Sequence, residues 1–128
     1  MPFSTTSANA LLNHFLRNSS DYPTNHFALY SDVAATSEIV TIARQPCPSF
    51  SVPSSGSTTT LADVDFGDAP ASLTIRAWAI VTAASSGSIL FWDVCRDNGG
   101  NAVERAASGG DPISIFAGSL TISPATSL

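Results

Sequence analysis

Hydrophobic residues recur along this sequence with two different periods. Near the start they are three or four positions apart, which is the spacing of one face of an α-helix. Ser7 is suited to cap this helix, and Asn18 with the polar residues after it is suited to end it. The pattern predicts an extended tail over 1–6 and a helix over 7–18. The predicted apolar stripe consists of Ala8, Leu11, Leu12, Phe15 and Leu16.

After Pro23 the pattern changes to short apolar and β-branched runs separated by polar turns, which is typical of β-strands. Glycine, proline, asparagine and aspartate fall between the runs, as expected of turns. We expect 54–60 to be a polar loop and Gly118 to mark a bend between two half-strands. The predicted strands cover 26–30, 39–44, 49–52, 61–66, 73–81, 89–95, 102–107, 113–116 and 120–122.

The clearest of these signals is a hairpin between 73–81 and 89–95. Strict alternation over the first strand places Leu73 and every second residue after it on one face, with Thr74 and every second residue after it on the other. A polar turn around Gly87 joins the two strands. Trp78 and Trp92 then lie on facing strands.

Seven to nine short strands at even spacing, with one helix in front, favour one architecture. We expect a mainly β protein, an antiparallel β-sandwich or jelly-roll-like barrel with a short N-terminal helix. The length of 128 residues suits one domain, 1–128, with an independent core.

Composition and charge exclude several classes of protein. The chain has five arginines, no lysine and a formal net charge of −5, which argues against binding nucleic acid through its phosphates. Its longest apolar runs are too short to span a membrane, and ample Ile, Val, Leu and Phe argue against disorder. A surface of serine, threonine, aspartate and asparagine is weakly charged, which permits close packing against other proteins.

The two cysteines, Cys47 and Cys95, allow two interpretations. Without a signal peptide pattern at the start, we expect synthesis in the reducing host cytoplasm, where two small buried thiols are the simpler interpretation. A disulfide formed later, in an oxidising medium, is the alternative. Neither cysteine has a neighbouring cysteine or histidine at metal-binding spacing.

Candidate chemistry along the chain is sparse. His14 and His26 have no carboxylate or nucleophile partner nearby in sequence. Asp63, Asp65 and Asp68 form the densest acidic cluster and could hold calcium, but a solvated strand face explains them better. We therefore expect no catalytic, cofactor-binding or metal site. Trp78 and Trp92 are expected in the core or at a subunit interface, with stacking on a sugar as the alternative.

Several short motifs, in their order along the chain, resemble small structural proteins of tailed bacteriophages. Such proteins are labelled head-decoration (cement), tail-fibre or virion structural proteins. The resemblance implies a non-enzymatic virion component. The motifs are Leu-Arg-Asn ending the predicted helix at 16–18, Ala-Leu-Tyr at 28–30, Ala-Arg-Gln at 43–45, the hairpin, Gly-Asp at 110–111, and Phe-Ala-Gly-Ser-Leu-Thr at 116–121.

Within this family the main hypothesis is a capsid decoration protein on the outer surface of the head. It would bind the lattice of the major capsid protein, act as a homo-oligomer, with a trimer as the natural geometry, and stabilise the assembled shell by mass action. The alternatives are a tail-fibre or tail-tip component that recognises the host, with Trp78, Trp92 or the 97–111 loop contacting sugar, and, more weakly, a small β-sandwich hydrolase or a lectin-like module.

For the main hypothesis the important residues are structural. Four helix residues are expected to dock the helix, so that Phe15→Ala lowers stability by a few kcal/mol. Three aromatic residues fill the core or an interface, and Arg76 is expected to pair with a carboxylate on a neighbour. The full set is Leu11, Leu12, Phe15, Leu16, Arg76, Trp78, Trp92 and Phe116.

Overall fold

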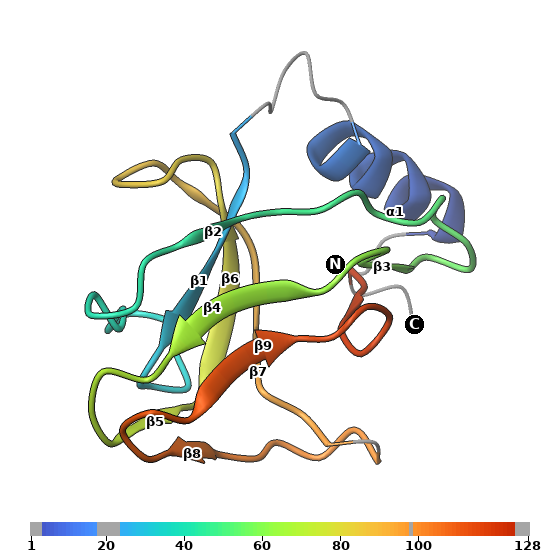
Figure 1. The fold of residues 1–128 in the computed structure, drawn as a ribbon. Coiled ribbons are helices and arrows are strands. Elements are labelled where there is room, and N and C mark those ends of the chain that lie inside the picture. Colours follow the sequence, from blue (N-terminus) through green and yellow to red (C-terminus); the bar gives the residue numbers. More distant parts are fainter. Residues whose placement is uncertain (1–3, 18–23, 98, 125–128) are drawn as a thin grey trace.

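The computed structural model describes residues 4–17, 24–97 and 99–124. It is mainly β, with antiparallel strand pairs and one short N-terminal helical segment, as the sequence predicts (Figure 1). The described strands form no closed barrel, and their arrangement is sandwich-like. The elements are α1 (Thr5–Leu12), η1 (Asn13–Arg17), β1 (His26–Tyr30), β2 (Gln45–Pro46), β3 (Thr58–Thr59), β4 (Val64–Asp68), β5 (Leu73–Ile75), β6 (Ala77–Val81), β7 (Ile89–Val94), β8 (Arg105–Ala107), β9 (Pro112–Ile115) and β10 (Thr121–Ile122).

The helix begins earlier than predicted. Ser4, in extended conformation, caps α1, because its hydroxyl oxygen accepts a hydrogen bond from the backbone N–H of Ser7 at 3.1 Å. The predicted Ser7 cap is therefore wrong, and the prediction of an extended tail is wrong from residue 5 onward. Residues 1–3 and the predicted end at Asn18 lie outside the described residues. After α1 the last described turn, η1, is a π-helix.

The central sheet has the strand order β2-β1-β6-β7, with every pair antiparallel. It contains the predicted hairpin, whose register runs from Ala77 opposite Val94 to Val81 opposite Ile89. All five residues of β6 are buried because β6 is an inner strand with both faces covered. The predicted strand over 26–30 is β1, which pairs with β6 along its whole length.

The predicted strand 73–81 is two strands rather than one. It breaks at Arg76, so that β5 pairs with β8 while β6 pairs with β1 and β7. The break also shifts the alternation of faces, because Ile75 joins the same buried cluster as Trp78, whereas Ala77 belongs to a second cluster. The prediction of one unbroken two-faced strand is therefore wrong beyond the break.

The predicted strand over 39–44 is wrong, because this segment forms a turn with Val40 82% exposed. Tyr30 at one end of β1 bridges Glu38, while Phe27 pairs with Gln45. The segment paired with β1 therefore advances seven residues, from Glu38 to Gln45, while β1 advances three. The four extra residues have no partners on β1, so they loop out of the sheet edge despite their β-branched side chains.

The predicted polar loop over 54–60 contains a tight hairpin. Ser55 and Gly56 both have positive φ, 54° and 81°, which matches a two-residue type I′ turn. Ser54 and Ser57 exchange both backbone hydrogen bonds across it. The hairpin continues through β3, which pairs with β10, and the predicted 49–52 strand is reduced to a single bridge from Phe50.

Toward the C-terminus the predictions hold with shifted bounds. The strand expected at 61–66 is β4, and the one expected at 102–107 shortens to β8. Gly118, with a φ of 76°, turns the chain between β9 and β10, as predicted. Strand β9 pairs with β4 and β10 pairs with β3, so the two half-strands belong to different pairs.

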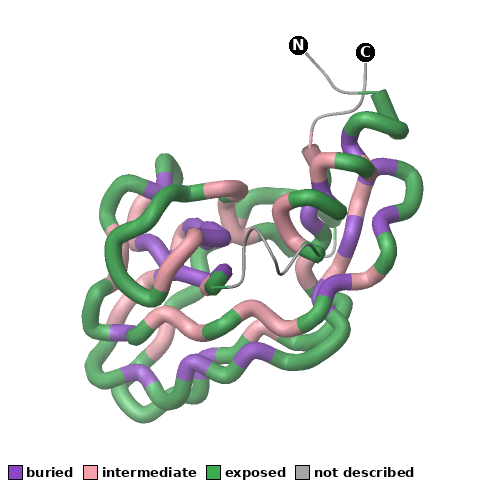
Figure 2. The backbone as a smooth tube through the Cα atoms, turned by 90° about the horizontal axis from the view of Figure 1, so that it is seen from above, coloured by how far each residue is buried: buried purple, intermediate pink, exposed green. Residues whose placement is uncertain are grey.

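The core lies between the central sheet and the β4–β9 pair, which crosses in front of it in Figure 1. Aromatic rings pack together in this core, with the Phe27 ring centroid 6.1 Å from that of Trp78 on the neighbouring strand and 6.3 Å from that of Phe50. A smaller, alanine-rich cluster covers the other face of the sheet. Figure 2 shows buried positions threading through the strands and exposed positions along the connecting loops.

Candidate functional site

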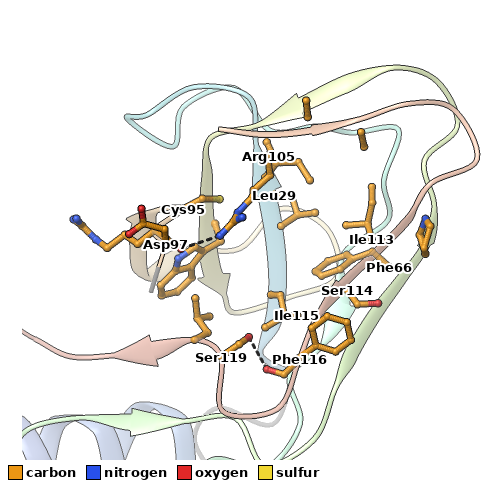
Figure 3. Close-up of a pocket in the computed structure, with 17 residues that line it drawn as sticks. Leu29, Phe66, Cys95, Asp97, Arg105, Ile113, Ser114, Ile115, Phe116 and Ser119 are labelled. Carbon is orange, nitrogen blue, oxygen red and sulfur yellow. Dashed lines mark hydrogen bonds between the residues drawn. The ribbon is translucent and has the colours of Figure 1, made fainter. Parts of the chain in front are cut away.

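A cavity of about 440 Å³ opens on the side of the sandwich (Figure 3). Strands β8 and β9 follow one another through a turn at 108–111, but within the described chain β8 pairs with β5 and β9 pairs with β4. The two strands therefore diverge, and the cavity lies where they separate. It is lined by Leu29, Phe66, Ile75, Trp78, Cys95, Arg96, Asp97, Arg105, Ala106, Ala107, Pro112, Ile113, Ser114, Ile115, Phe116, Ser119 and Leu120.

The inner wall of the cavity is the hydrophobic core itself. Leu29 comes from β1, Phe66 from β4, Ile75 from β5 and Trp78 from β6, and all four side chains are buried. Because β1 and β6 are the two inner strands of the sheet, their residues are held by hydrogen bonds on both sides. The cavity therefore has a rigid apolar interior of the kind that ligand sites use.

Polar groups gather around the mouth of the cavity. The residue Arg105 lies on β8, and its Nη2 donates a hydrogen bond to the backbone oxygen of Arg96 at 3.0 Å. The Asp97 carboxylate accepts hydrogen bonds from the backbone N–H groups of Asn101 and Gly99 at 3.0 and 2.9 Å, which hold its pKa below the usual value. Figure 3 shows Arg105 and Asp97 on one side and Ser114 on the other.

The arginines near the mouth differ in their partners. The Arg96 guanidinium pairs with Asp93 at 2.9 Å. In contrast, no carboxylate oxygen of the described residues lies within 4.0 Å of the Arg105 guanidinium. Arg105 is thus an exposed cation beside an apolar cavity, with no carboxylate partner among the residues described.

The predicted helix-docking residues contact the rest of the protein to different extents. Leu12 is fully buried in the main cluster, and Leu16 packs against that cluster while half-buried. The Phe15 ring meets Phe91 of β7 edge to face, with centroids 6.1 Å apart. Leu11 is half-buried.

The predicted aromatic and arginine residues also differ in burial and in location. Trp78 is buried and lines the cavity, whereas Trp92 is 49% exposed and lies opposite Ala79, toward the other face of the sheet. Phe116 is 65% exposed at the cavity rim, so it does not fill the core. Arg76 pairs with Glu104 of the same chain at 3.2 Å. Contact of Arg76 with a neighbouring subunit remains a prediction.

The other sequence candidates lie away from the cavity or at its edge. The Asp63 carboxylate accepts a hydrogen bond from the backbone N–H of Ala117 at 2.7 Å, and Asp65 accepts one from Gly67 at 2.8 Å. In the described ranges no three histidine, cysteine or acidic side chains come together as metal ligands. His26 contacts the backbone oxygen of Thr24 at 2.6 Å.

Both cysteines are free thiols, half-buried against the core. Burial raises the pKa of Cys47 to about 12. Burial also raises the pKa of Cys95, which lines the cavity. The thiols are therefore protonated near neutral pH, which makes them weak nucleophiles.

Sequence reasoning missed Arg105 and the cavity. The loop over 97–111, named as a candidate sugar contact, does contain Arg105. However, neither the candidate loop nor the strand predicted over 102–107 gives any sign that this arginine lacks a carboxylate partner. Only the separation of β8 from β9 places this side chain beside the apolar interior.

Taken together, the fold and surface define a small antiparallel β-protein with large exposed apolar side chains and an open cavity, which has an apolar inner wall and a polar mouth. A family model described as podophage GP4 fiber I protein gp80 matches residues 2–123, and the chain belongs to this family. It is accordingly a virion structural protein, as the sequence resemblance predicts. None of the curated proteins matches the chain. No helix in the described ranges is long and apolar enough to cross a membrane.

Proposed function

We propose that the chain is a non-enzymatic component of the tail fibre of a podophage, and not a decoration protein of the head. The observation that carries this proposal is the match to a fibre family over residues 2–123, nearly the whole chain. The family description names a fibre and no head protein, so it favours the tail-fibre alternative over the decoration hypothesis.

A fibre component must bind other subunits, and the surface of this chain offers material for such contacts. Large apolar side chains on a surface are typical of faces that another protein covers. We propose that the chain forms a homo-oligomer through some of them, and a trimer remains the simplest geometry. The exposed large apolar residues are Val33, Val40, Val52, Leu61, Ile89, Trp92 and Phe116.

The location in the virion can be tested directly on purified particles. An antibody raised against the full chain, carrying a gold label, is applied to intact particles and to isolated tails. Label at the tail, present on both preparations, is the expected result. Label spread over the head would support the decoration hypothesis and refute the fibre proposal. If the particles carry no label and mass spectrometry finds no peptides of this chain in them, both hypotheses are refuted.

A further inference from the structure

The unpaired arginine at the mouth of the cavity is the strongest unexplained feature of the molecule. Arginine carries a full charge and five N–H donors in a planar fork that matches a carboxylate. Arg44, Arg76 and Arg96 all pair with carboxylates of this chain, but Arg105 has none within 4.0 Å among the described residues. Among the described residues, the Arg105 guanidinium donates one hydrogen bond, to the backbone oxygen of Arg96, which leaves further donors for a ligand.

The size and lining of the cavity narrow the class of ligand. A volume of about 440 Å³ falls in the range of small-molecule sites. The interior is apolar, and the exposed ring of Phe116 stands at the rim, where the C–H face of a sugar ring could pack. Ser114, Ser119 and Asp97 surround the same opening with groups that can bond to hydroxyls (Figure 3).

We propose that this cavity binds an acidic sugar, with its carboxylate on Arg105 and its ring between Phe116 and the apolar wall. A charged group held by arginine, an apolar ring face and several hydroxyls together match the features of the site. A neutral sugar would leave the arginine with only the longer-range attraction of Asp97, whose pKa it helps to lower, and a simple carboxylate would leave the apolar wall uncovered. This inference rests on the proposed function, because a fibre that recognises a host surface would meet such sugars there.

The test follows the full ¹⁵N-labelled chain by NMR while methyl β-D-glucuronide is added. The sequence has two tryptophans, so two indole N–H signals report on two places, and Trp92→Phe assigns them. Trp78 lines the cavity, whereas Trp92 lies away from it. We expect a saturable shift of the Trp78 signal with a Kd of about 1 mM or somewhat weaker, while the Trp92 signal stays unchanged.

Matched ligands and variants separate specific binding from a general attraction of charge. Methyl β-D-glucoside carries an uncharged hydroxymethyl group in place of the carboxylate, and we expect it to bind at least roughly tenfold more weakly. Arg105→Gln should weaken glucuronide binding by a similar factor, and Arg105→Lys by less. Arg17→Gln removes the same charge from the exposed end of the helical segment and should leave binding unchanged.

Four results would overturn the proposal. They are no saturable shift with glucuronide at tens of millimolar, equal binding of the glucoside, an equal response to sodium acetate, and an equal loss in Arg17→Gln. The spectrum of each variant shows whether it is folded. If the label lies on the tail but no glucuronide binds, only this inference fails. If glucuronide binds but the label lies on the head, the fibre proposal fails and the site stands.

Discussion

Replacing Leu12 with alanine tests whether the N-terminal helix is part of the folded core. Leu12 is the one large residue of α1 that is fully buried, and it lies in the same cluster as Phe27 and Trp78 of the sheet. An amphipathic helix of this length is marginal by itself, so its stability must come from such contacts. Removing the side chain loses its transfer free energy and leaves a cavity that the surrounding strands cannot close.

The expected cost is about 3 kcal/mol, because Leu→Ala at fully buried sites costs about 2–5 kcal/mol. For a domain of this size each kcal/mol lowers Tm by about 3–5 °C, so Tm should fall by about 10 °C. Urea unfolding followed by tryptophan fluorescence gives the free energy of unfolding. Leu61→Ala is the matched control, because Leu61 is 60% exposed and its truncation should change stability by under about 0.5 kcal/mol. A loss below about 1 kcal/mol in Leu12→Ala, or one equal to that of the control, would refute helix docking.

Three further predictions concern an ion pair, a thiol and a carboxylate. Arg44 pairs with Glu38 at 2.7 Å, and both side chains are largely buried. Arg44→Ala should therefore lower the free energy of unfolding in urea by about 2–3 kcal/mol, whereas Arg96→Ala, which breaks an exposed pair, should lower it by less than about 1 kcal/mol. Equal losses in the two variants would contradict this prediction. Cys47, with its pKa raised to about 12, should react with iodoacetamide at pH 8 far more slowly in the folded than in the urea-unfolded chain, and equal rates would show that it is exposed. A threonine hydroxyl and a serine N–H lower the pKa of Asp32 in the fold, so its ionised form stabilises the fold above about pH 4 and this stabilisation is lost as pH falls towards the lowered pKa. Asp32→Asn should flatten that part of the acid unfolding profile, and an unchanged profile would show that Asp32 contributes nothing to it.

The related Phe15→Ala variant shows how the structure changes a sequence-based expectation. The sequence predicts a loss of a few kcal/mol for a buried aromatic. In the structure Phe15 is half-buried and meets Phe91 edge to face, so we expect about 1–2 kcal/mol. A double-mutant cycle with Phe91→Ala isolates the ring pair, and a coupling energy near zero would refute the contact.

Local patterns were sufficient for the β6–β7 hairpin because its two strands are neighbours in sequence, although the alternation predicted over 73–81 is broken at Arg76. The β1 strand was predictable for a similar reason, since a short apolar run bounded by turns has few other solutions. These signals depend on residues that are close together along the chain. They also established the mainly β class before any pairing was known.

The prediction of a strand over 39–44 failed because local strand propensity does not show how many residues can pair with the neighbouring strand of the sheet. Its β-branched residues favour a strand locally. Whether they enter the ladder depends on the distance between Glu38 and Gln45, whose partners on β1 are only three residues apart. The Ser4 cap was missed for a simpler reason, since Ser4 and Ser7 are equally good capping residues and only the geometry decides between them.

The candidate site could not be predicted from the sequence because it forms where the pairing between two strands is interrupted. The backbone N–H of Cys95 donates to the backbone oxygen of Arg76, while Arg105 pairs with Ile75, the residue before Arg76. One strand therefore advances a single residue while its partner advances ten. Among the described residues of this insertion, Arg96 pairs with Ala102, and the backbone N–H of Asp97 donates to the backbone oxygen of Asn101. This excursion carries Arg96 and Asp97 to the cavity mouth, and Arg105 follows directly after it.

The same interruption explains why a polar wall can stand beside an apolar core. A continuous strand would have to place every second residue inward, and a charged residue there would cost several kcal/mol unless it were paired. An inserted hairpin escapes that alternation, so it can present charged side chains at the edge of the core while the ladder resumes behind it. Shortening 96–104 to a two-residue turn should therefore remove glucuronide binding while the β5–β8 and β6–β7 pairs persist. Loss of those pairs in the NMR spectrum would show instead that the excursion is needed to build the sheet.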